Sequence, residues 1–106
     1  MAEPSRLTPE EARILGVLIE KQATVPDTYP LSLNALTAGC NQKTGRDPVM
    51  ELTEAEVLSA IDSLRAYDLI IESSGGRVAR YSYNLGRVFQ LPTPAIALVT
   101  LLILRG

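Results

Sequence analysis

The clearest hydrophobic pattern in this chain lies in residues 53–83. The pattern begins with Thr53-Glu54-Ala55-Glu56, where a hydroxyl and a carboxylate three residues later can satisfy two free amides at a helix start. Apolar residues then recur at helical spacing, and we expect them to face the core: Val57, Leu58, Ile61 and Leu64. An apolar run at 69–72, a Ser-Ser-Gly-Gly turn at 73–76 and a second extended run at 77–83 follow, which is typical of a β-hairpin. A capped helix that leads directly into a hairpin is the back half of a winged helix.

Another helix is predicted near the amino terminus, from Pro9 to about Lys21. Thr8 can cap it, Pro9 suits the first helical position, and Glu11 completes a second capping box. The face expected to meet the core comprises Glu11, Ala12, Leu15, Leu18 and Ile19, and the opposite face comprises Glu10, Arg13, Glu20 and Lys21. Val17 falls among the polar side chains, so it is a candidate for a contact outside the domain.

Two prolines mark residues 24–30 as a connection, and a further helix is predicted from Leu31-Ser32 to about Asn41. Within that helix Leu33, Leu36 and Cys40 are spaced for burial, and Gly39 weakens it near its end. A loop from Gln42 to Pro48 then precedes residues 49–52, which we expect to supply a short third strand beside the hairpin.

The carboxyl-terminal segment, 91–106, is unusually apolar. Pro92-Thr93-Pro94 favours a helix start, and Thr100 is the single polar side chain between Ala95 and Leu104. A helix that is apolar all round must be buried on most sides, yet this one is shorter than the roughly 20 residues that span a bilayer. It therefore packs over the domain, pairs with a second copy, or belongs to a further domain. For homo-oligomer formation the interface candidates are Ile96, Val99, Leu101 and Ile103.

Composition limits the function classes. The 106 residues are 46% hydrophobic, which is typical of a globular chain. Together with the predicted helices and hairpin, this indicates one α+β domain, mostly helical, at 1–90, followed by the apolar helix at 91–106. A net charge of -2 gives no global attraction to nucleic acid, so an anion-binding surface must be local. The chain has no histidine, and its one cysteine, Cys40, excludes an internal disulfide. We therefore expect no enzyme, metal or cofactor and, since the amino terminus lacks a secretory signal, a cytoplasmic protein that binds no membrane.

Several local strings resemble the YceH family of bacterial proteins of unknown function. They are Tyr29–Leu36, Cys40–Lys43, Arg46, Pro48-Val49, Glu56-Val57, Arg77-Val78 and Arg80-Tyr81. The resemblance covers nearly the whole chain and implies tandem winged helices, of which the first has three helices and a two- or three-stranded wing. It also implies that 91–106 is the opening helix of the second. It implies no established activity.

Winged helices commonly place their third helix in the major groove of DNA and their wing on the backbone. The expected outward face of the 53–66 helix reads bases poorly, since it lacks Arg, Lys, Asn and Gln: Ala55, Glu56, Ser59, Asp62, Ser63 and Ala66. The cations that could hold phosphates lie in the flanking loops: Lys43, Arg46, Arg77 and Arg80. Four phosphate contacts predict weak, nonspecific binding to double-stranded DNA with a salt slope of about -3.6. The alternative is that these are solvated charges paired with Asp47, Asp68 and Glu72.

A second hypothesis is a protein-interaction or dimerisation module with no direct DNA binding. The small, weakly acidic outward face of the 53–66 helix and the apolar tail both favour it. An enzyme is the weakest hypothesis, because the turn at 73–76 lacks the lysine and following helix of a phosphate-binding loop. The paired carboxylates Glu54 and Glu56 are explained by electrostatics at a helix start.

Overall fold

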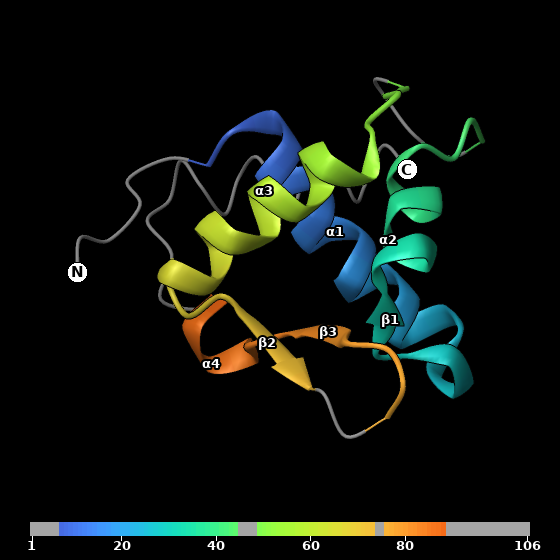
Figure 1. Ribbon diagram of the computed structural model, residues 1–106. Helices are drawn as coiled ribbons and strands as arrows, with labels where there is room; N and C mark the ends of the chain where they lie inside the picture. The colour runs from blue at the N-terminus through green and yellow to red at the C-terminus, as the bar shows by residue number, and fades with distance from the viewer. Residues whose placement is uncertain (1–6, 45–48, 74–75, 89–106) are drawn as a thin grey trace.

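The computed structural model describes residues 7–44, 49–73 and 76–88 as a mixed α and β fold, mostly helical. The elements are α1 (Pro9–Thr24), the 3-10 helix η1 (Pro26–Thr28), β1 (Leu31–Ser32), α2 (Leu33–Cys40), α3 (Glu54–Ala66), β2 (Ile70–Ser73), β3 (Arg80–Tyr83) and α4 (Leu85–Val88). Figure 1 shows β2 and β3 below α3, with β1 at the lower end of α2. The sequence-predicted tail helix, 91–106, lies outside the described residues.

The strands form one antiparallel sheet in the order β1-β3-β2. The hairpin is confirmed: Ile70 pairs with Tyr83 and Ser73 with Arg80. The third strand comes from β1, where Leu31 pairs with Tyr81, so the prediction of a third strand at 49–52 is wrong. Ser32 ends β1 and also caps α2, which therefore begins at Leu33.

Both predicted capping boxes are present. The Thr8 amide donates to the Glu11 carboxylate at 2.8 Å, and the Glu11 amide donates to the Thr8 hydroxyl at 3.1 Å. Thr53 and Glu56 make the same two bonds at 2.9 and 3.1 Å. Each box satisfies two amides that the first turn of a helix leaves without partners, which fixes where α1 and α3 begin.

The clearest differences between the core and the predicted helical faces are at Val17, Arg13 and Leu58. Val17 and Arg13 are each 2% exposed, so the predictions of an external contact at Val17 and of a solvent-facing Arg13 are wrong. Because α1 packs against both α2 and α3, its buried surface is wider than one face, and residues 11–18 are all buried. Leu58 was predicted to face the core, but its side chain is 39% exposed, so this prediction is wrong. The buried face of α3 consists of Val57, Ile61 and Leu64.

Residues 41–53 connect α2 to α3. This connection is much longer than the three- or four-residue turn that joins the helices of a simple helix-turn-helix. It carries Lys43, and its first residues are held by side-chain hydrogen bonds described below.

Candidate nucleic-acid interface

The structure describes three of the four predicted phosphate-binding cations, and all three are exposed: Lys43, Arg77 and Arg80. Arg46 lies outside the described residues. Lys43 follows α2, whereas Arg77 lies in the turn between β2 and β3. Within the part of the chain that the structure describes, neither Lys43 nor Arg77 makes an ion pair. Their charges therefore remain available to an anion.

Arg80 has a structural contact as well as an exposed charge. One guanidinium nitrogen donates to the Pro30 carbonyl at 3.1 Å, while the backbone of Arg80 pairs with Ser32 of β1. Guanidinium has five N–H donors, so this single bond leaves donors for a further acceptor. Arg80 thus ties β3 to the segment before α2 and keeps its positive charge near the first turn of that helix.

An ion pair between Arg65 and Glu72 neutralises the acidic residue of the hairpin. The Arg65 Nη1 and Glu72 Oε1 atoms are 2.9 Å apart, which joins the last turn of α3 to β2. The sequence-based alternative paired Glu72 with the wing cations, and Arg65 was not among them. Because Glu72 meets Arg65, it is not the counter-ion of Arg77. This pairing depends on how the last turn of α3 lies against β2, and the hydrophobic pattern of the sequence does not show that.

The outward face of α3 has the predicted members, and all six are exposed: Ala55, Glu56, Ser59, Asp62, Ser63 and Ala66. The Glu56 carboxylate accepts from the Thr53 amide and completes the cap. This face carries carboxylates, small side chains and no cation, so it remains poorly suited to reading base edges.

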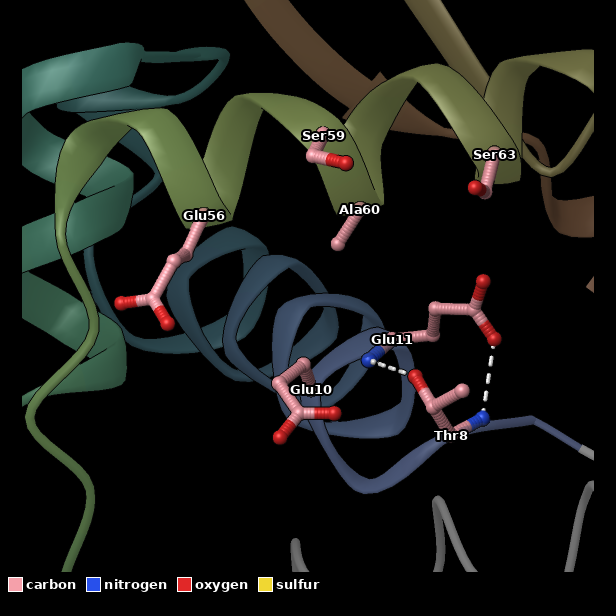
Figure 2. A pocket seen from close by; sticks show the side chains of 7 residues that line it. All are labelled: Thr8, Glu10, Glu11, Glu56, Ser59, Ala60 and Ser63. Atoms are coloured by element: carbon pink, nitrogen blue, oxygen red, sulfur yellow. Dashed lines mark hydrogen bonds between the residues drawn. The ribbon is translucent and has the colours of Figure 1, made fainter.

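An open hollow of about 320 Å³ lies between the start of α1 and one flank of α3. It is lined by Thr8, Glu10, Glu11, Glu56, Ser59, Ala60 and Ser63. Figure 2 shows three carboxylates around it, two of which belong to the capping boxes. Because its charged side chains are all acidic, this flank of α3 repels phosphates, and an approach by nucleic acid from the hairpin side is favoured.

Two tyrosines brace the hairpin against the helices. The Tyr83 amide donates to the Tyr29 hydroxyl oxygen at 2.9 Å, and the Tyr83 hydroxyl donates to the Gln22 side-chain carbonyl at 2.7 Å. The two rings meet edge to face, with centroids 6.3 Å apart. Burial raises the pKa of Tyr29, although the bond from Tyr83 partly offsets this. This brace was not predicted; the aromatic residues at 29 and 83 were its only sequence signal.

Two side-chain amides at the end of α2 hold the connection that carries Lys43. Asn41 Nδ2 donates to the Leu52 carbonyl at 2.7 Å, and the Leu52 amide donates to Asn41 Oδ1 at 2.7 Å. Gln42 Nε2 donates to the Thr44 carbonyl at 2.7 Å, while Lys21 Nζ donates to Gln42 Oε1 at 3.3 Å. These residues were missed by sequence reasoning, because nothing in the local pattern shows that Leu52 returns to Asn41.

Of the predicted interface residues, Val17 is buried where α1 packs against α2, which contradicts the predicted contact outside the domain. The other four lie outside the described residues: Ile96, Val99, Leu101 and Ile103. The Cys40 side chain is fully buried, as predicted. Among the residues that the structure describes, no group of three metal-binding side chains occurs, and each helix is too short or too polar to cross a bilayer.

Comparison with known proteins identifies similar chains of unknown function. A family model described as a protein of unknown function, DUF480, matches residues 7–106. A UPF0502 protein of Leptothrix cholodnii is 67% identical over 100 residues, which cover 94% of this chain and 45% of that protein. A UPF0502 protein of Burkholderia ambifaria is 66% identical over 100 residues, covering 94% of this chain and 42% of the relative. This chain thus spans less than half the length of these relatives, whose names state no activity.

Proposed function

The chain belongs to the DUF480 family of proteins of unknown function, and we propose that its described residues form a winged-helix module that contacts nucleic-acid phosphates. The order of its elements supports this proposal, because three helices precede a hairpin and a short strand between α1 and α2 pairs with that hairpin. In this proposal β2, β3 and their turn form the wing. We also propose that this module is the first of two tandem winged helices, as the YceH resemblance implies.

The observation that carries the proposal is the pair of exposed, unneutralised cations at Lys43 and Arg77. Glu72 is engaged by Arg65, so the wing retains its positive charge, while the acidic hollow occupies the α1 flank of α3. Contacts from such side chains fix the position of a protein on a duplex without reading its sequence. The expected partner is double-stranded DNA, bound weakly and without sequence preference.

A salt titration tests the proposal. Binding of the full chain to a fluorescent duplex is measured by anisotropy from about 50 to 200 mM salt, with Lys43→Ala/Arg77→Ala as the test variant. Loss of two phosphate contacts should make the salt slope shallower by about 1.8. Arg65→Ala/Glu72→Ala is the control, since it removes a cation together with its own counter-ion and leaves the net charge of the wing unchanged. An unchanged slope in the test variant would rule out the proposed contacts.

The alternative function is a protein-interaction module, and the exposure of Leu58 favours it. Leu58 lies on the side of α3 that the acidic hollow does not occupy, and two further apolar side chains, Ile71 and Val78, are at least half exposed on the hairpin. If the wild-type chain binds no duplex even at low salt, this alternative replaces the first. Self-association that Leu58→Ser weakens, measured by sedimentation, would then support it.

A further inference from the structure

The connection between α2 and α3 is closed at its stem by one side chain. Asn41 offers Leu52 a donor and an acceptor, as a neighbouring backbone strand would, and both bonds measure 2.7 Å. Residues 41 and 52 are thereby brought together although ten residues separate them in the sequence.

Gln42 fixes the chain on the other side of Lys43. Its Nε2 atom donates to the carbonyl of Thr44, and its Oε1 atom accepts from Lys21 on α1. The backbone before Lys43 is therefore tied to Leu52, and the backbone after it is tied, through Gln42, to α1. Lys43 itself is exposed and, within the described residues, has no ion-pair partner.

This arrangement reduces the entropy that Lys43 loses on binding. A flexible loop must order its backbone before a cation can hold a phosphate, and that cost subtracts from affinity. Where the backbone is already fixed on both sides, only the side-chain rotamers of the lysine remain to be ordered. The outward face of α3 offers no comparable group, since its charged members, Glu56 and Asp62, are carboxylates, while Arg65 in the last turn is paired with Glu72.

We propose that Asn41 and Gln42 are positioning residues that present Lys43 to a phosphate of duplex DNA. Lys43, rather than the outward face of α3, then forms the main contact of the helical part of this domain with the nucleic-acid backbone. This inference rests on the proposed function and goes beyond it, because it assigns roles to two neutral amides and ranks one element above another.

The test is a double-mutant cycle on duplex binding by the full chain, measured by anisotropy across the salt range used above. The variants are Asn41→Ala, Gln42→Ala, Lys43→Ala, Asn41→Ala/Lys43→Ala and Arg77→Ala, with Asn34→Ala as an exposed-amide control on α2. Lys43→Ala should make the salt slope shallower by about 0.9. Asn41→Ala should lose much of the binding that Lys43 contributes, and the Kd of the double variant should match that of Lys43→Ala within about twofold. Circular dichroism checks that each variant is folded. If Asn41→Ala does not fold, Gln42→Ala takes its place in the comparison.

The outcomes separate the two ideas. If the wild-type chain binds and the effects of Asn41→Ala and Lys43→Ala simply add, the amides do not act through Lys43 and this inference fails while the proposed function stands. If Lys43→Ala binds like the wild type but Arg77→Ala does not, contact is confined to the wing and the inference again fails. If the wild-type chain binds no duplex at low salt, the proposed function fails and the inference fails with it.

Discussion

The Cγ1 atom of Val17 lies 2.8 Å from the position that a Cβ atom on Gly39 would occupy. The backbones of α1 and α2 therefore approach each other at this point as closely as a residue without a side chain allows. Val17 is 2% exposed, and its branched side chain has little rotameric freedom within a helix. Gly39 thus permits a helix contact, in addition to the weakening of α2 that its helix propensity predicts.

Replacing Gly39 with alanine tests this contact. Alanine has a helix propensity better than glycine by about 1 kcal/mol, but overpacking in a fitted core costs about 1–3 kcal/mol. We expect Gly39→Ala to lower the free energy of unfolding, measured in urea, and Val17→Ala to relieve part of that loss in the double variant. Gly86→Ala is the control, since an added Cβ there meets nothing closer than 3.9 Å. A Gly39→Ala variant as stable as the wild type would contradict the close approach.

Asp68 has a φ angle of 61°, in the left-handed region, and follows Tyr67, the C-cap of α3. The Leu69 amide bonds the Leu64 carbonyl at 2.9 Å, so Asp68 occupies the position at which glycine commonly ends a helix. We expect Asp68→Gly to raise the free energy of unfolding by up to about 1 kcal/mol, because glycine adopts this conformation without steric cost. Asp62→Gly, inside α3, should lower it by about 0.3 kcal/mol, the difference between the helix propensities of aspartate and glycine. Thermal or urea unfolding gives both signs, and destabilisation by Asp68→Gly would count against this account.

The features predicted correctly from the sequence are local ones. Both capping boxes, the hairpin and the exposure of the outward face of α3 depend on residues within a few positions of each other. A hydroxyl with a carboxylate three residues later satisfies helix amides whatever surrounds it, as Thr53 and Glu56 show. Such signals survive without knowledge of how the elements pack.

The features that were missed depend on distant partners. A helical wheel assumes one buried face, but α1 is covered by two helices, so Arg13 is inside and donates to the Cys40 carbonyl at 3.1 Å. The third strand was not predicted at Leu31 because its partner, Tyr81, lies far along the chain. The Asn41 bonds likewise require the chain to return at Leu52. Periodicity describes one segment at a time, so it cannot supply any of these pairings.

The apolar segment 95–104 lies outside the described residues, and its sequence predicts self-association. We expect the chain to self-associate through Ile96, Val99, Leu101 and Ile103, because a helix apolar all round buries only part of its surface against one small domain. Sedimentation velocity should show a dimer or larger species. Replacement of those four residues by serine should yield a monomer, whereas Leu85→Ser, on an exposed side chain of α4, should leave the assembly intact. A monomeric wild-type chain at high concentration would refute the expectation.

Ionisation of Tyr81 makes the free energy of unfolding depend on pH in the alkaline range. Burial, with a smaller contribution from the negative charge of Glu72, raises the pKa of Tyr81 above its ordinary value of 10.0. Because the unfolded chain then releases this proton first, the stabilising contribution is complete below pH 10 and is lost as the pH rises through the folded pKa. We expect Tyr81→Phe to decline less steeply, with a difference of up to about 1.4 kcal/mol per pH unit for one proton. Urea unfolding of both proteins at several pH values above 9 measures this; parallel curves would show that Tyr81 ionises alike in the folded and unfolded states.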